Sequence, residues 1–343
     1  MHSIKQIAQK LSATIVGDEN RSFKNIKPLE QAGPEDLSFF APTGNKKIAE
    51  LMEMAKNSTA AALLVTQAYD EIKTTQIITP NPLGAIVMIA TMFFSAKRPP
   101  AVVDKNAAVS PTAKIGENVS VGAFAVIGDE VEIGDNSIIH PHAVIYYGSK
   151  IGKNCQIHAG AIIRENVILG DHCVIQNGVV VGGDGFGYFP DKDIGHRHIP
   201  HIGNVVLESY VDMGANATID RAMLGEARVG RATKIDNLVM IGHNAQIGER
   251  TLICGSSGIA GSCKIGNDVI IGGGVGVADH LTIGDKVRAI ARSGITTDVP
   301  ANTDVGGYPQ TTAHNWRREV ALIRKLPDLF KDLREIKRKL SSL

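Results

Sequence analysis

The stretch KIDNLVMIGHNAQIG, residues 234–248, carries an isoleucine at every sixth position: Ile235, Ile241 and Ile247. The same spacing of aliphatic residues runs through residues 103–181 and resumes over residues 229–283, often with a glycine directly after the aliphatic residue. This is the hexapeptide signature of a parallel β-helix, in which each hexapeptide forms a short strand and a turn. The pattern predicts a mainly β fold of about ten to eleven triangular coils, roughly 50 Å long, with ladders of Ile and Val inside.

His243 lies in this stretch two residues after an inward-pointing isoleucine, so the repeat predicts that its side chain points outward near a corner of the coil. Asp236, Asn237 and Asn244 accompany it, and a carboxylate near an imidazole can fix the tautomer of the ring. His280 follows about two coils later. A histidine on the surface of a solenoid can also be merely solvated, so spacing alone leaves a catalytic role and a surface role open.

The hexapeptide rhythm is predicted to break once, at GGDGFGYFPDKDIGHRHIPHIG, residues 182–203. A long excursion from a regular solenoid is usually functional or caps the fold, and we expect this one to project as a loop. Its histidines, His196, His198 and His201, match no standard zinc spacing. We therefore predict loop packing or ligand contacts for them, and no metal site.

The repeat divides the chain into three predicted segments. Residues 1–100 show no hexapeptides and are expected to form a small α/β domain, with short strands near residues 61–67 and 75–80. The β-helix covers residues 101–308. The longest apolar run of the chain, in the first segment, is shorter than the roughly 20 residues that cross a bilayer, so no stable membrane insertion is expected.

Residues 309–343 are predicted to be a basic, amphipathic helix that Pro327 would kink. Its leucines and isoleucine follow a heptad-like seam, which predicts packing against symmetry mates or, alternatively, against the chain's own core: Leu322, Leu326, Leu329, Leu333, Ile336 and Leu340. Three flat β-helix faces also favour side-by-side packing, and a homotrimer would place clefts between neighbouring prisms.

Composition narrows the possible partners and the compartment. Lys plus Arg number 36 and Asp plus Glu number 35, so the charge balance gives no indication of a nucleic-acid partner. The four cysteines form no CxxC pair, and with no signal peptide we expect reduced, mostly buried thiols in a cytoplasmic protein. Cys155 and Cys173 are one coil apart and should share a ladder column.

Six motifs of the chain are more specific than the hexapeptide repeat: DLSFF (36–40), GGDGFGYFP (182–190), MGANATIDR (213–221), KIDNLVMIGHN (234–244), GIAGSCKIG (258–266) and IGGGVGVADH (271–280). In these motifs, and over nearly its whole length, the chain resembles the UDP-3-O-(3-hydroxyacyl)glucosamine N-acyltransferases of lipid A biosynthesis. The resemblance implies a left-handed β-helix, a homotrimer, and transfer of a 3-hydroxyacyl group from acyl carrier protein to the 2-amino group of a UDP-3-O-acyl-glucosamine.

The resemblance also implies roles for individual residues. His243 matches the catalytic histidine of the family, and Asp236 matches the acidic residue that supports it. Gly261 matches the backbone amide of the oxyanion hole, and His280 matches a histidine of the acyl-donor site. Phe39 matches an aromatic residue that holds uracil in an N-terminal uridine-binding domain.

The chain departs from the family pattern after Phe39, where FFAPTGNKKIAEL is lengthened and lacks a tyrosine, and at Ala222, where the family has glycine. The chemistry nevertheless suits the residues. When an amine attacks a thioester, the amine loses a proton and the carbonyl oxygen becomes an oxyanion. An imidazole can take the proton, and a backbone N–H can stabilise the oxyanion. The resemblance implies that acyl carrier protein is the donor substrate, and with such a donor neither a covalent acyl-enzyme nor a cofactor is required.

The acidic carrier protein would be received by basic residues, although each of these could equally be solvated surface: Lys286, Arg288, Arg292, Arg317 and Arg318. Three rival interpretations remain. A β-helical O-acyltransferase acting on UDP-N-acetylglucosamine commonly lacks an N-terminal domain. A β-helical zinc carbonic anhydrase would need three histidines that meet between two chains. A non-catalytic scaffold would not need His243 or the GFGY loop.

Overall fold

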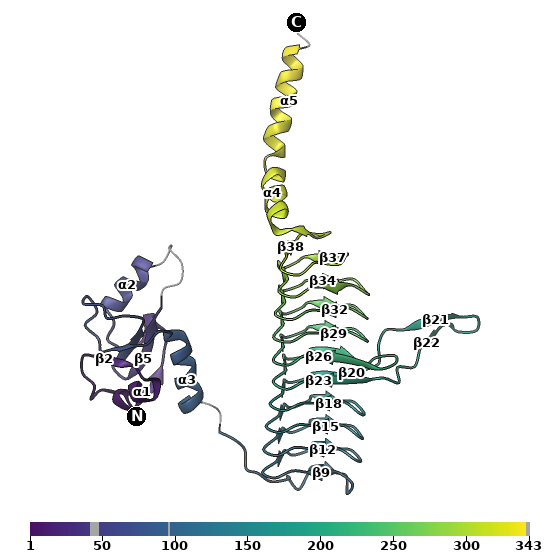
Figure 1. Cartoon of the computed structure of the whole chain (residues 1–343), viewed down its shortest axis with the longest axis horizontal. Coiled ribbons are helices and arrows are strands. Elements are labelled where there is room, and N and C mark those ends of the chain that lie inside the picture. The colour runs from purple at the N-terminus through teal and green to yellow at the C-terminus, as the bar shows by residue number, and fades with distance from the viewer. Residues whose placement is uncertain (42–47, 95–96, 341–343) are drawn as a thin grey trace. The chain divides into compact units, whose positions relative to one another are not determined.

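The computed structural model describes residues 1–41, 48–94 and 97–340. It divides the chain into two compact units, Met1–Arg98 and Pro99–Leu343, and each is described by itself (Figure 1). The division between the units falls two residues before the end of the predicted N-terminal domain.

The first unit is a five-stranded α/β sheet with helices on its faces. The predicted strands near residues 61–67 and 75–80 are present as central strands. The sheet order is β2 (Thr14–Val16), β7 (Gln76–Ile78), β6 (Ala62–Val65), β5 (Asp36–Phe40) and β4 (Asn25–Ile26), with only β2 antiparallel to its neighbour. A short hairpin and the helices complete the unit: β1 (His2–Ser3), β3 (Ser22–Phe23), α1 (Ile4–Leu11), α2 (Ile48–Lys56) and α3 (Pro82–Phe94).

The second unit is a parallel β-helix whose three faces are three stacked sheets. Most of its strands are two residues long. Each consists of an outward-pointing residue and the inward-pointing residue after it, and a turn follows directly. The sheets run from β10 (Ser120–Val121) to β39 (Thr311–Thr312), from β8 (Ala108–Val109) to β37 (Gly294–Ile295), and from β9 (Lys114–Ile115) to β35 (Thr282–Ile283).

The inward residues form the predicted ladders. In one sheet the register places Ile219, Ile241, Ile259, Val277 and Ile295 directly above one another, and all are buried. Burying one such side chain contributes about 1.5–3 kcal/mol, so the long ladders supply most of the driving force for this architecture.

The cysteine column is also as predicted. Cys155 and Cys173 are buried within the same hydrophobic core, and all four cysteines are free thiols.

The solenoid is interrupted twice, not once as the sequence predicted. The first insertion leaves the helix between β20 (Val180–Gly183) and β23 (Asn204–Leu207) and carries a projecting hairpin of β21 (Tyr188–Asp191) and β22 (Gly195–His198) (Figure 1). The second is a short bulge, residues 221–225, between β25 (Thr218–Asp220) and β26 (Glu226–Val229). Together the two insertions add a multiple of six residues, so the spacing resumes in its original frame and hides the second one.

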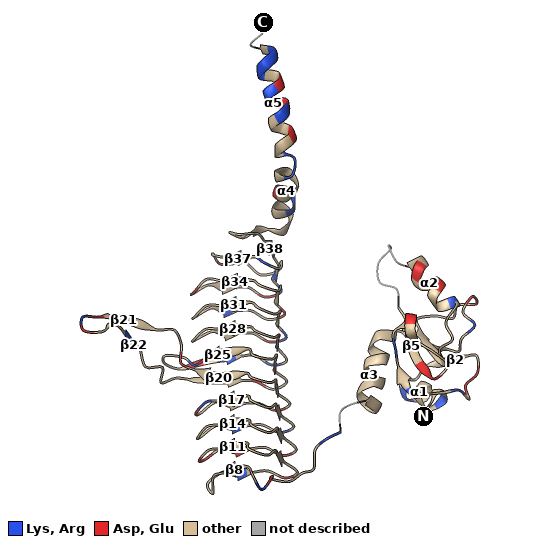
Figure 2. Ribbon diagram, turned by 180° about the vertical axis from the view of Figure 1, so that it is seen from behind, with Lys and Arg blue, Asp and Glu red and all other residues tan. Residues whose placement is uncertain are grey.

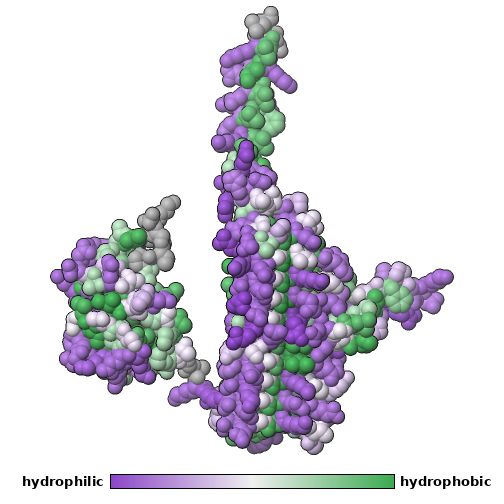
Figure 3. Space-filling model, in the orientation of Figure 1, coloured by the Kyte–Doolittle hydropathy of each residue, from purple (hydrophilic) through white to green (hydrophobic). Residues whose placement is uncertain are grey.

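The C-terminal segment contains two helices in place of one kinked helix. α4 (Ala313–Ile323) packs against β38 (Asp304–Gly306) and β39, and α5 (Leu326–Leu340) follows it (Figure 1). One helix ends at Ile323 and the next begins at Leu326, so Pro327 lies in the first turn of α5. A missing backbone N–H costs nothing there, because the first N–H groups of a helix have no partner within the helix. The predicted apolar seam is exposed and follows one side of the helix (Figure 3), while lysines and arginines mark the same segment in Figure 2.

Candidate active site

His243 stands in the turn that follows β28 (Met240–Ile241), at a corner of the β-helix. It faces a cavity of about 370 Å³ that the turns of neighbouring coils and the first insertion enclose. The structure therefore brings three of the predicted site residues together, since His243, Gly261 and His280 all belong to this cavity. Its lining is Phe186, Asp220, Met240, Gly242, His243, Ala260, Gly261, Asp279 and His280.

Gly261 approaches the imidazole so closely that no side chain fits at its position. A Cβ atom there would lie 2.8 Å from both Cε1 and Nε2 of His243. The backbone N–H of Gly261 has no hydrogen-bond partner in the described part of the chain. An unpaired amide beside a histidine ring is the arrangement that an oxyanion site requires.

Asp236 is not beside His243 within the chain. It follows β27 (Lys234–Ile235), which belongs to a different face of the helix from β28. Its Oδ2 accepts a hydrogen bond of 2.9 Å from the backbone N–H of Gly255, and its Oδ1 accepts one of 2.7 Å from Asn237. The expected support of His243 by Asp236 is thus not seen inside one chain, where this carboxylate stabilises a turn.

The acidic residue that does share the cavity is Asp220, at the end of β25. Burial raises the pKa of Asp220 to about 6, the nearby His243 opposes that rise, and Asp184 adds to it. Sequence reasoning quoted the motif around Asp220 without assigning it a role. The sequence feature that could have identified it is its place directly after the inward Ile219. Ile219 pairs with Ile241, so Asp220 lies one coil below the turn of His243.

The first insertion also places His201 against the ring of His243. This side chain is buried, and its ring lies 5.3 Å from the ring of His243, centroid to centroid, at an angle of 62°. Gly185 explains the close fit, since a Cβ there would lie 2.6 Å from Nε2 of His201 and 2.8 Å from Cβ of His243. Burial lowers the pKa of His201, because removal from water disfavours the charged imidazolium.

Arg221 fixes the base of the same insertion. Its guanidinium is buried and donates to the carbonyl oxygens of Gly182, at 2.8 Å, and Glu165, at 3.1 Å. It also forms an ion pair of 3.1 Å with the carboxylate of Glu165. The insertion is thereby anchored where it leaves the solenoid.

A second hollow, of about 400 Å³, continues from the cavity along the same sheet face, because Met240 and Ala260 line both. Its wall is made of outward positions that carry little or no side chain, Gly258, Gly276 and Gly294. Tyr308 closes the far end, and a Cβ at Gly294 would lie 1.8 Å from its ring. The result is a groove that starts near His243 and stops at Tyr308.

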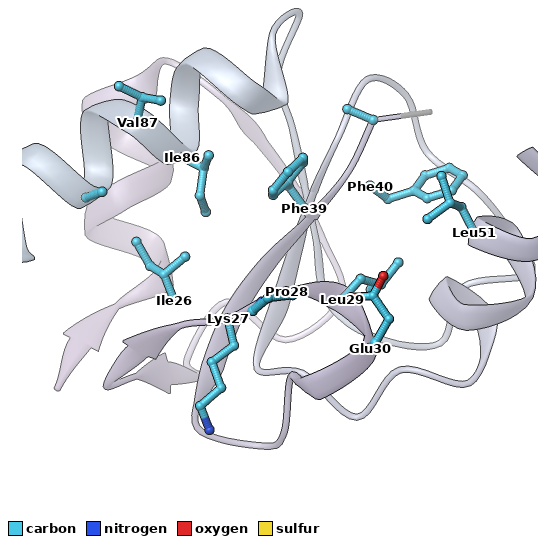
Figure 4. A pocket seen from close by; sticks show the side chains of 12 residues that line it. Ile26, Lys27, Pro28, Leu29, Glu30, Phe39, Phe40, Leu51, Ile86 and Val87 are labelled. Atoms are coloured by element: carbon cyan, nitrogen blue, oxygen red, sulfur yellow. The ribbon is translucent and has the colours of Figure 1, made fainter. Parts of the chain in front are cut away.

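Phe39 belongs to a separate cavity of about 530 Å³ in the first unit, at the end of β5. Figure 4 shows Phe39 and Ile86 side by side, with Phe40 directed the other way towards Leu51. The alternation along the strand explains this arrangement. The lengthened segment after Phe39 falls largely on residues 42–47, which lie outside the described residues.

The five basic residues are dispersed. Arg288 forms a bidentate ion pair with Asp304, with both N–O distances 2.8 Å, and Arg292 lines the groove. Lys286 is exposed on a turn, and Arg317 and Arg318 are exposed on α4.

The part of the chain that the structure describes contains neither a metal-binding cluster nor a membrane-spanning helix. Among residues 1–41, 48–94 and 97–340, no three His, Cys, Asp or Glu side chains are grouped so that they could hold a metal ion. No helix within these ranges is both long enough and apolar enough to cross a bilayer.

Comparison with known structures establishes the class first. The UDP-N-acetylglucosamine acyltransferase of Arabidopsis matches 64% of this chain and 77% of its own with a TM-score of 0.57 and 21% identity. The two proteins share their fold, a left-handed parallel β-helix, which is the fold class the sequence predicted. A family model described as the GMPPB C-terminal domain matches residues 97–200.

Sequence relatives then define the particular family. A UDP-3-O-acylglucosamine N-acyltransferase of Thermosynechococcus vestitus is 45% identical over 98% of both chains. UDP-3-O-acylglucosamine N-acyltransferase 3 of Gloeobacter violaceus is 44% identical over 98% of this chain and 96% of its own. The chain belongs to the family of UDP-3-O-acylglucosamine N-acyltransferases and is an acyltransferase.

Proposed function

We propose that this protein transfers a 3-hydroxyacyl group from an acyl carrier protein thioester to the 2-amino group of UDP-3-O-(3-hydroxyacyl)-glucosamine in lipid A biosynthesis. The observation that carries the proposal is that His243, His280 and Gly261, whose backbone N–H has no partner in the described residues, line the same cavity. Family membership supports the choice of acceptor.

The reaction follows from these groups. The substrate amine attacks the thioester carbonyl carbon and forms a C–N bond, while negative charge moves onto the carbonyl oxygen. His243 takes the proton that the amine loses, a step that typically contributes about 10²–10⁴-fold. The Gly261 N–H stabilises the oxyanion. Collapse breaks the C–S bond, and the departing sulfur receives the proton from His243, so an amide and a thiol are formed.

The groove lined by Gly258, Gly276 and Gly294 suits the acyl chain. A surface without side chains lets methylene groups lie against the sheet and leave water, at about 0.8 kcal/mol for each one buried. The donor thioester would then lie at the near end, beside His243 and His280.

The remaining assignments are also proposals. Phe39 contacts the uracil in the cavity of the first unit. Homotrimers complete the active clefts, and exposed basic residues, with Arg292 at the groove and Arg317 and Arg318 on α4, receive the carrier protein. The reaction takes place in the cytoplasm and needs no cofactor, since the thioester already activates the acyl group. Asp236 could support His243 only from a neighbouring chain.

The test is an acyl-transfer assay with purified acyl-carrier-protein thioesters of several lengths and two acceptors, UDP-3-O-acyl-glucosamine and UDP-N-acetylglucosamine. Transfer to the nitrogen of the first acceptor is expected. Transfer only to the hydroxyl of the second would make the protein an O-acyltransferase and overturn the proposal.

His243→Ala is expected to keep the protein folded and lower kcat by about 10²–10⁴-fold, because the general base is lost. His196→Ala is the control, since that histidine is exposed on the hairpin. Near-normal turnover of His243→Ala would remove His243 from the mechanism.

A further inference from the structure

The imidazole of His243 has one hydrogen-bond partner, the side chain of the next residue. Nδ1 of His243 lies 3.2 Å from Oδ1 of Asn244. In the described part of the chain no other group bonds to either ring nitrogen of His243. The proton on Nδ1 therefore depends on which end of the Asn244 amide faces the ring.

The backbone of the second insertion fixes that amide. Nδ2 of Asn244 donates to the carbonyl oxygen of Leu224 at 2.9 Å. Oδ1 of Asn244 accepts from the backbone N–H of Met223 at 3.0 Å. A flipped amide would set an NH₂ group against an N–H and an oxygen against a carbonyl, so both contacts would become repulsive.

This orientation determines the tautomer of His243. Because Oδ1 of Asn244 can only accept, Nδ1 of His243 must carry the proton, and Nε2 keeps its lone pair. Nε2 is also the ring nitrogen next to Gly261. The atom left free to take a proton thus lies beside the unpaired amide.

From this geometry we propose that Asn244 is a positioning residue, held by the bulge at residues 221–225, that keeps His243 in the tautomer whose Nε2 is the base. The inference rests on the proposed function and deepens it, since it assigns the part expected of Asp236 to an uncharged amide. It also gives the second insertion a purpose, because Met223 and Leu224 lie in that bulge.

Other titratable groups approach His243 without bonding to its ring nitrogens. His201 packs against the ring from the first insertion, while Asp220, Asp279 and His280 line the cavity from neighbouring turns. None of them replaces Asn244 as the partner of Nδ1.

The backbone of Asn244 permits a clean variant. Its φ is 59°, in the left-handed region, where glycine is favoured and most other residues are strained. Asn244→Gly therefore removes the amide without backbone strain. The matched control is Asn154→Gly, since Asn154 occupies the same turn position three residues after an inward isoleucine, has φ 56° and is exposed.

Asn244→Gly is expected to lower kcat about tenfold or more with KM changed by less than about twofold, because binding is intact and the base is in the wrong tautomer part of the time. Asn244→Asp restores an acceptor and adds a charge that favours the protonated ring. It should recover kcat at high pH and move the acid limb of kcat/KM upward by about one pH unit. Asn154→Gly should match the unmodified enzyme.

Unchanged kcat in Asn244→Gly, or an unmoved acid limb in Asn244→Asp, would overturn the role of Asn244. A direct readout is independent of activity: ¹⁵N chemical shifts of histidine-labelled protein, with the His243 signal assigned by its loss in His243→Ala. A protonated Nδ1 and bare Nε2 that reverse or mix in Asn244→Gly support the proposal, and the opposite tautomer in the unmodified protein refutes it. If transfer to the UDP-sugar fails while the ¹⁵N result holds, the proposed function alone is wrong.

Discussion

Gly261 shows how one missing side chain shapes the proposed catalytic site. The hexapeptide turn tolerates other residues at this position, which elsewhere carries His243 and Asp279. Glycine is required here because the His243 ring occupies the space of a Cβ. The sequence alone shows a glycine in a glycine-rich repeat, whereas the contact with the ring shows why this one matters.

Gly261→Ala is therefore expected to push the His243 ring aside and lower kcat about 10–100-fold with little loss of stability, since a misplacement of about 1 Å can cost that much. The control is Gly273→Ala at the equivalent turn position, where a Cβ would meet no atom closer than 3.5 Å. Steady-state kinetics of both variants test this. Equal kcat values in the two would show that the close contact has no effect on catalysis.

Asp220 gives a pH-dependent signature. Its pKa is raised from the ordinary value of 3.8 to about 6 in the folded protein, so between these values the folded state binds more protons than the unfolded state. Stability from this group is present at low pH and is lost as pH rises through about 6. Asp220→Asn removes this titrating carboxyl and with it the pH-dependent contribution to stability.

The expected result is that the Tm of the unmodified protein, minus that of Asp220→Asn, falls between pH 4 and pH 6 and is constant above about pH 7. Thermal melting across this range measures it. A difference that stays flat with pH would mean that burial does not perturb this carboxyl.

At the scale of elements, the two insertions and the end of the β-helix shape the candidate active site. The solenoid itself offers flat, repetitive faces. The first insertion brings Phe186 to the cavity and His201 against the ring of His243. The second insertion holds Asn244, and Tyr308 closes the groove where the last coil ends.

Tyr308→Ala is expected to open the far end of the groove and shift the preference towards longer acyl chains. Each additional methylene that becomes buried contributes about 0.8 kcal/mol, or about fourfold in kcat/KM. Competition between carrier-protein thioesters of different lengths measures the shift, and Tyr147→Ala, at an exposed tyrosine on an earlier coil, is the control. An unchanged ranking of chain lengths would show that the groove does not hold the acyl chain.

At the scale of the whole molecule, the exposed apolar seam of α5 is expected to pack against another surface. Leucines at 329 and 333 are about half exposed, and a 15-residue helix is marginally stable alone in water. In the homotrimer proposed above, the other copies of the chain would supply that partner.

The double variant Leu329→Ala/Leu333→Ala should lower helical content by far-UV circular dichroism and weaken association in sedimentation, although alanine is the best helix former. Any loss of helix must then come from lost packing. Lys331→Ala/Arg334→Ala, on the same helix, should keep both signals. Full helicity in the leucine variant would mean that the seam is not packed.

The sequence by itself determined the solenoid, its ladders and the outward place of His243, because a six-residue period fixes which side chains point inwards. It also predicted the separate N-terminal unit. The tertiary structure decided what surrounds His243. Asp236, seven residues away in sequence, falls on another face of the coil, whereas Asp220, His201 and Leu224 reach this corner from insertions and earlier coils. The period says nothing about these neighbours, because insertions that together restore the frame leave no trace in the repeat, and the contacts exist only once the coils are stacked.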